Sequence, residues 1–160
     1  MEILDVVNDE DEVIGSAVKQ QIYAEKLCHR IVHVLVFNEN NELALQLRGP
    51  SVSYLPLHWS TSVGGHVDTG ESYETAALRE MQEELGIQVP VFEFKKYQFE
   101  LPNTGLKKFL GVFKATYSGE MNPGEREVAD VVWKSLDEVQ QMIASGEKFH
   151  PELLFILQNL

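Results

Sequence analysis

Three glutamates lie on one stretch of predicted helix at a spacing that could gather their carboxylates. Because successive helix residues turn by about 100°, Glu80, Glu83 and Glu84 fall within a sector of roughly 100°. Like charges three or four residues apart destabilise a helix slightly, so a positive charge among them would be favourable. Arg79 can reach Glu83 one turn further on, and a divalent cation would neutralise more of the repulsion. Oxygen ligands in this number suit Mg²⁺ or Mn²⁺, whereas zinc would want His or Cys.

An acidic face exposed to solvent is the alternative explanation, because charge runs usually lie on solvated faces. The surrounding residues favour chemistry. Residues Gly65 to Ile87 read Gly-x5-Glu-x7-Arg-Glu-apolar-x-Glu-Glu-x-Gly-apolar. This pattern resembles the Nudix box at every defined position. The box marks a family that hydrolyses nucleoside diphosphates linked to another moiety.

The resemblance implies a metal site on this helix. Glu80 and Glu84 would be ligands of Mg²⁺ or Mn²⁺, the carbonyl of Gly65 would complete the site, and Glu83 would be a further ligand or a close neighbour of the metal. Metal ions on the diphosphate would neutralise its charge and lower the pKa of a bound water. The implied substrate is a small organic diphosphate.

The resemblance also assigns supporting roles. Arg79 would orient the glutamates, and Glu71 would brace the loop by hydrogen bonds. A carboxylate must accept the proton of the attacking water, and Glu80 and Glu127 are the candidates for this catalytic base. An ordinary carboxylate at the start of a strand is the alternative for Glu127.

Within the family the chain is more similar to the branch that resembles isopentenyl-diphosphate isomerase. The signs are His29 ahead of the first core strand, the segment Trp59 to His66, and the segment Glu127 to Trp133. That isomerase needs a cysteine just before the box and two glutamates on a later strand. In our alignment these three places are occupied by Gly64, Leu106 and Lys108.

A proton-shuttling isomerase cannot work without its acid and base, so we expect a hydrolase on this frame. An isomerase and a non-catalytic binding module remain as alternatives. The branch resemblance makes His29, His66 and Arg48 candidates for ligand or substrate contacts, with ordinary packed or surface side chains as the alternative. His33 shares a strand face with His29.

Other polar and aromatic residues have simpler interpretations. Trp59 and Trp133 could stack on a base, but packing is the expected role. Cys28 is the only cysteine, which excludes an intramolecular disulfide, and it is expected to be a small buried side chain.

The pattern of elements predicts an α/β fold, a Nudix-like α/β/α sandwich with a mixed sheet and the box at its centre. The box helix should begin after Ser72 as N-cap and end at Leu85 before Gly86. Strands are expected, partly as hairpins, at Ile3–Val7 with Val13–Ser16, Ile31–Phe37 with Glu42–Leu47, Thr61–Val63, Val91–Leu101 with Lys107–Tyr117, and Val128–Trp133. Helices are expected at Leu136–Ser145 and Pro151–Asn159.

Length and composition indicate one domain over residues 1–160, with residues 1–28 as an N-terminal hairpin or extension and residues 65–87 as the box. A net charge of −12 makes nucleic acid an unlikely partner. The chain shows neither a signal peptide nor a membrane-spanning run, so a cytoplasmic location is expected. The last helix has an apolar side, which would dock on the domain or on a second subunit of a homodimer.

Overall fold

A mixed sheet of seven strands forms the centre of the computed structural model, which describes residues 1–124 and 126–160. Its main path runs β5-β4-β3-β8-β7, while β6 pairs with β3 and β9 pairs with β4. β3 and β8 are parallel and the other pairs are antiparallel. The strands are β3 (His29–Phe37), β4 (Leu43–Arg48), β5 (Trp59–Ser60), β6 (Val63–His66), β7 (Phe92–Glu100), β8 (Lys107–Thr116) and β9 (Val128–Lys134).

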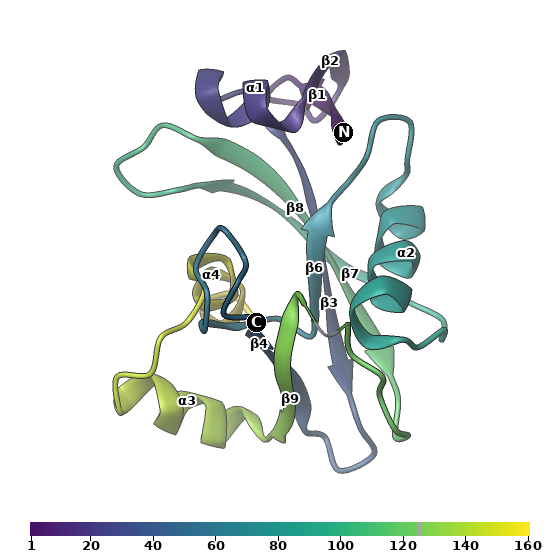
Figure 1. Ribbon diagram of the computed structural model, residues 1–160, viewed down its shortest axis with the longest axis vertical. Coiled ribbons are helices and arrows are strands. Elements are labelled where there is room, and N and C mark those ends of the chain that lie inside the picture. Colours follow the sequence, from purple (N-terminus) through teal and green to yellow (C-terminus); the bar gives the residue numbers. More distant parts are fainter. Residues whose placement is uncertain (125) are drawn as a thin grey trace.

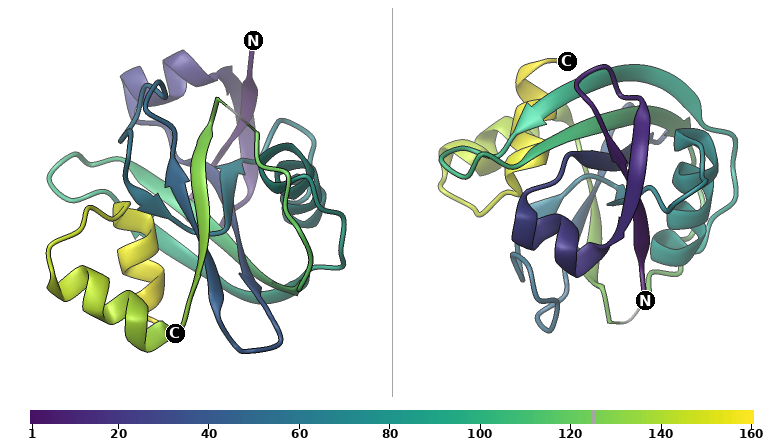
Figure 2. Two further views of the ribbon diagram at one scale, coloured as in Figure 1. Left: turned by 60° about the horizontal axis from the view of Figure 1, so that its bottom comes forward. Right: turned by 90° about the horizontal axis from the view of Figure 1, so that it is seen from above.

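Helices cover both faces of this sheet (Figures 1 and 2). Successive side chains of β3 point to opposite faces. Val32 and Val34 pack in a core with α2 (Tyr73–Leu85). Leu35 packs on the other face with α3 (Leu136–Ala144) and α4 (Pro151–Gln158). The predicted α/β/α sandwich is confirmed.

The box helix α2 begins and ends where the sequence predicts. Ser72 is its N-cap and accepts a hydrogen bond from the Thr75 amide, while Gly86 takes the left-handed conformation at φ 67° after the last turn. The buried residues of α2 include Ala77, Met81 and Leu85, whereas the apolar side chain of Leu78 is exposed. The buried side is centred on Ala77 and Glu84, and Leu78 lies about 100° away from that centre.

The N-terminal hairpin is also confirmed, as β1 (Ile3–Val7) paired with β2 (Val13–Val18). It is followed by a short helix, α1 (Lys19–Glu25), which the sequence analysis did not predict. The Val18 N-cap gives no side-chain capping bond, and only Ile22 of this helix is buried. The usual start signal and apolar periodicity are therefore both missing.

The strand expected at Thr61–Val63 is wrong, because the chain leaves β5 at Ser60 and enters β6 only at Val63. Here side chains replace the strand ladder. The Thr61 hydroxyl donates to the Val63 carbonyl, and the Ser62 hydroxyl donates to the Ala44 carbonyl while accepting from the Val36 amide.

The remaining expected strands and helices are present within two residues of their predicted ends. The hairpin of β3 and β4 pairs only at its tip, Phe37 with Leu43, and β6 pairs with β3 from Ile31 to Val34. The last helix, α4, docks on the domain itself through the fully buried Leu153 and Ile156. No helix among the described residues is long and apolar enough to span a membrane.

Candidate active site

Two glycines of β6 contact carboxylates of the box helix. A Cβ atom at Gly65 would lie 2.5 Å from Oε1 of Glu80, so the Glu80 carboxyl group rests on the Gly65 backbone. The Gly64 amide donates to Oε1 of Glu84 at 3.1 Å. On the other face of the sheet, a Cβ at Gly64 would meet the ring of His33. The carboxylates of Glu80 and Glu84 are therefore held against residues 65 and 64.

Burial dominates the electrostatics of these two carboxylates. It raises the pKa of Glu84 to about 8, and the neighbouring charge of Glu80 acts in the same direction. The Glu84 carboxylate accepts hydrogen bonds from Gln46 and Gly64, which offset only part of this shift. Burial also raises the pKa of Glu80 to about 7 against the opposing charge of Arg79. At neutral pH, the positive charge near Glu80 and Glu84 is therefore too small to keep both carboxyl groups ionised.

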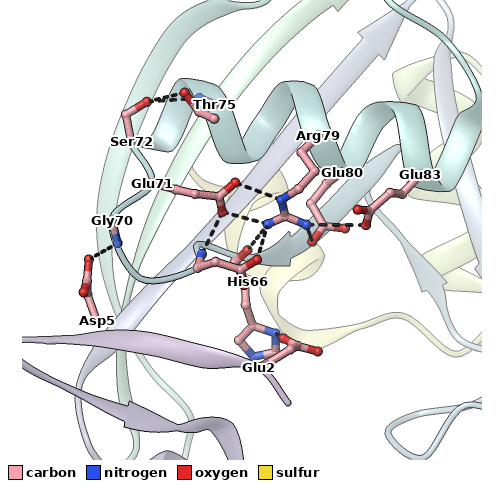
Figure 3. A network of polar contacts seen from close by, with 11 residues as sticks. Glu2, Asp5, His66, Gly70, Glu71, Ser72, Thr75, Arg79, Glu80 and Glu83 are labelled. Atoms are coloured by element: carbon pink, nitrogen blue, oxygen red, sulfur yellow. Dashed lines mark hydrogen bonds and ion pairs between the residues drawn. The ribbon is translucent and has the colours of Figure 1, made fainter.

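Arg79 connects the helix with the loop that precedes it (Figure 3). Its guanidinium donates to both oxygens of Glu71 at 2.8 Å, to Oε1 of Glu80 at 2.9 Å and to the His66 carbonyl at 3.1 Å. A longer contact of 3.4 Å reaches the exposed Glu83. Glu71 in turn accepts from the Asp68 amide at 2.8 Å. The loop and the carboxylates of α2 therefore share one rigid set of hydrogen bonds.

A family model described as NUDIX domain matches residues 28–155. The chain belongs to the Nudix family. It is a Nudix hydrolase, like the relatives that resemble it over nearly the whole length of both chains. A Nudix hydrolase of Listeria monocytogenes is 32% identical and covers 99% of this chain and 96% of its own length. The Nudix hydrolase YfcD of Escherichia coli is 32% identical, with 96% and 83% covered.

Solved structures share the fold of this chain. The crystal structure of DR0079 from Deinococcus radiodurans superposes with a TM-score of 0.85 at 27% identity, covering 99% of this chain and 98% of that one. The Nudix domain of Shewanella oneidensis NrtR, solved with ADP ribose, has a TM-score of 0.64 at 19% identity and covers 81% and 83%. At that identity the likeness shows the fold alone.

The carboxylates of the Nudix box are not arranged around a metal position. Within residues 1–124 and 126–160, no three His, Cys, Asp or Glu side chains are grouped so that they could hold a metal ion. Glu80 faces Arg79, and Glu84 is turned to Gln46 and the Gly64 amide. Glu127 lies exposed in the turn before β9, and its charge raises the pKa of both Glu80 and Glu84. Glu80, Glu84 and Glu127, which the sequence predicted for a shared site, are thus near enough for their charges to affect one another.

His29 and His66 lie together on the other face of the sheet from Glu80. Their rings stack with centroids 5.7 Å apart, and the Tyr23 hydroxyl lies 2.7 Å from Nε2 of His66. Nδ1 of His29 bonds the Leu27 carbonyl, and its Nε2 is buried without a partner among the described residues. Burial lowers the pKa of His29 to about 4 and that of His66 to about 3, so both rings are neutral at pH 7.

A buried ionic cluster beside these histidines was not predicted from the sequence. Glu152 of α4 accepts from Nε2 of His33 and from the Lys108 ammonium, each at 2.8 Å. Burial opposes ionisation of Glu152, yet His33 and Lys108 hold its pKa well below the usual range. Lys108 and Glu152 are far apart in the sequence. The signal that could have found them is a charged residue inside an otherwise apolar strand and helix.

The other predicted residues lie in packed or loop positions. Arg48 is the last residue of β4, and its Nε donates to the carbonyl of Tyr54 in the following loop. Trp59 packs in the core under α3 and α4, and Trp133 packs against the core under α2, so both have the packing role that was expected. Cys28 is half-buried, and burial raises the pKa of its thiol.

Proposed function

We propose that this Nudix hydrolase cleaves the diphosphate linkage of a small organic diphosphate, such as a nucleoside-diphosphate derivative, and that it depends on Mg²⁺ or Mn²⁺. One observation carries the proposal. The partly buried Glu80 lies against Gly65, and the buried Glu84 accepts from the neighbouring Gly64 amide, with pKa values raised to about 7 and about 8. Such a pair is costly unless a cation joins it, and oxygen ligands favour hard divalent ions.

The donor types, two carboxylates and a backbone carbonyl, suit a divalent cation. Glu80, Glu84 and the Gly65 carbonyl would hold it once Glu80 turns from Arg79 and Glu84 from Gln46. The exposed Glu83 and Glu127 would add ligands or negative charge. When bound, such an ion neutralises diphosphate charge and acidifies a coordinated water. Glu80 and Glu127 both remain possible acceptors of the proton of that water. Arg79 keeps Glu80 in place, and Glu71 ties Arg79 to the loop.

The substrate class rests on the family. Adenosine diphosphate ribose, which the Shewanella domain holds in its crystal, is a reasonable first test compound. Only the branch resemblance supports His29, His66 and Arg48 as substrate contacts, because His29 is fully buried and both histidines lie on the face of the sheet away from Glu80. Isomerase chemistry is disfavoured because Lys108 pairs with Glu152 and Leu106 is buried, so neither position offers a free acid or base.

The purified protein should be incubated with Mg²⁺ or Mn²⁺ and a panel of nucleoside diphosphates and triphosphates, nucleotide sugars including ADP-ribose, dinucleoside polyphosphates and isopentenyl diphosphate. We expect metal-dependent cleavage that Glu84→Gln abolishes. Glu74→Gln, which makes the same change at an exposed position of the same helix, should keep full activity. Isomerisation of isopentenyl diphosphate would support the second enzyme class instead. Absence of turnover together with absence of Mn²⁺ binding in calorimetry would support a binding module.

A further inference from the structure

The N-terminal hairpin lies directly against the loop that leads into the Nudix helix. The backbone of β1 pairs with this loop in an isolated antiparallel bridge of Leu4 with Asp68, which includes the hydrogen bond from the Thr69 amide to the Ile3 carbonyl at 2.9 Å. Residues 1–27 lie outside the part of the chain that the family model matches. The hairpin therefore adds contacts to the box from outside the family domain.

Asp5 makes the most specific of these contacts. It is buried, and its two carboxylate oxygens accept from different loop residues: Oδ1 from the Thr69 hydroxyl at 2.7 Å and Oδ2 from the Gly70 amide at 3.2 Å. Figure 3 shows this side chain reaching Gly70 from β1. Gly70 has a φ of 79°, and a Cβ added there would meet no atom of the described residues within 4 Å beyond its chain neighbours.

A second carboxylate of the same hairpin holds the start of the helix. Asp11 accepts from the hydroxyl of Tyr73, the first residue of α2, at 2.9 Å. Arg30 and Lys96 also donate to its carboxylate, at 2.7 and 2.8 Å, so Asp11 is fixed by strands of the central sheet. The segment between Asp68 and Tyr73 is thus held at both of its ends by the hairpin.

Arg79 holds the same segment from the opposite side. It grips Glu71 with two hydrogen bonds and also contacts Glu80, one of the proposed metal ligands. Any shift of residues 68–71 would move Glu71, and Arg79 would then shift against Glu80. A displacement of about 1 Å at a site of this kind can reduce activity by about a hundredfold.

We propose that the N-terminal hairpin maintains the geometry of the metal site and that Asp5 is the residue that positions the loop before α2. This inference rests on the proposed function, because it assumes that Glu80 binds a metal ion. Asp5 touches neither metal nor substrate. It acts through Thr69 and Gly70 on the Glu71–Arg79–Glu80 chain.

The test measures Mn²⁺ affinity by titration calorimetry on the full chain, without substrate, for the wild type, Asp5→Asn, Thr69→Val and the double variant. Thr69→Val removes the hydroxyl partner of Asp5 without changing any charge. Asp9→Asn is the matched control, because it removes an exposed carboxylate from the same hairpin. Hydrogen exchange of residues 68–71 and the melting temperature are recorded in parallel.

We expect each single variant to weaken Mn²⁺ binding by about tenfold, which is the lower end for groups that orient metal ligands. The double variant should bind Mn²⁺ as tightly as the more weakly binding of the two single variants, because both changes remove the same contact. Exchange at residues 68–71 should be faster in both, while Asp9→Asn matches the wild type. Wild-type affinity in the variants would overturn the inference, even if the melting temperature falls. A wild type that binds no Mn²⁺ would instead refute the proposed function itself.

Discussion

The carboxyl group of Glu80 lies over the α-carbon of Gly65, where a methyl group would stand 2.5 Å from Oε1. Any larger residue at position 65 would displace the Glu80 carboxyl group, because this group occupies the space of the missing Cβ. The same contact places Glu80 against residue 65, whose carbonyl the Nudix resemblance assigns to the metal site. Packing of the helix and geometry of the site thus depend on one position.

Gly65→Ala should therefore impair catalysis more than folding. The added methyl group would push Glu80 away, and we expect kcat to fall by about tenfold to a hundredfold. The cost in unfolding free energy should be about 1–3 kcal/mol, as for overpacked sites. Gly15→Ala is the control, because a Cβ there meets no atom of the described residues within 4 Å. Steady-state kinetics with unfolding in urea would check both values, and unchanged kcat would contradict the assigned role.

Stabilisation by Mn²⁺ should grow as the pH rises. The pKa values of Glu80 and Glu84 are raised to about 7 and about 8 in the metal-free protein, so the unfolded state binds fewer protons than the folded state above pH 4.5. The metal-free protein should then lose stability as pH increases through 7 and 8. Metal binding needs both carboxylates ionised and becomes easier over the same range.

The measurement is the rise in melting temperature at a fixed Mn²⁺ concentration, recorded from pH 6 to pH 9. We expect a small rise at pH 6 and a clearly larger one at pH 8.5. Glu84→Gln should show little rise at any pH, whereas the exposed Glu74→Gln should follow the wild type. An equal rise at pH 6 and pH 8.5 would argue against these carboxylates as the ligands.

Local sequence signals predicted the fold and the box helix well. Ser72 and Gly86 mark the ends of α2 by capping chemistry that acts within a few residues. Helix periodicity also placed Glu80, Glu83 and Glu84 in one sector, but it could not tell how deep each lies. Glu84 proved to be buried and Glu83 exposed, because the sheet packs under one side of that sector.

Contacts between distant residues could not be predicted in this way. Glu152 joins His33, which lies 119 positions earlier, and Asp5 joins Gly70 across 65 positions. Neither pair has a local pattern, because the docking of α4 brings Glu152 to His33, and the bridge of β1 with the loop before α2 brings Asp5 to Gly70. The short helix α1 was missed for a different reason, since its position depends on the burial of Ile22 alone.

The ion pair of Lys108 and Glu152 should matter for stability chiefly when one partner is removed. Both residues are about 5% exposed or less, and Glu152→Gln would leave the Lys108 ammonium buried without its counter-charge. We expect a loss of about 3–5 kcal/mol in unfolding free energy. Lys108→Met should also destabilise, but the double variant should lose less than the sum of the two. Lys107→Met, at the exposed neighbouring position, is the control in urea unfolding, and additive losses would contradict the coupling.

His150 should make the protein sensitive to acid. Nδ1 of this buried N-cap residue accepts from the Glu152 amide, and burial lowers the pKa of the ring to about 4. Because the unfolded value of the pKa is 6.5, the unfolded state binds more protons between pH 6.5 and pH 4, and the contribution of the neutral ring to stability is lost as the pH falls through this range.

His150→Asn keeps a capping acceptor but cannot titrate. Between pH 7 and pH 5 the wild type should lose about 1–2 kcal/mol more unfolding free energy in urea than this variant. His58→Asn should behave like the wild type, and equal losses in wild type and His150→Asn would show that His150 does not drive the acid sensitivity.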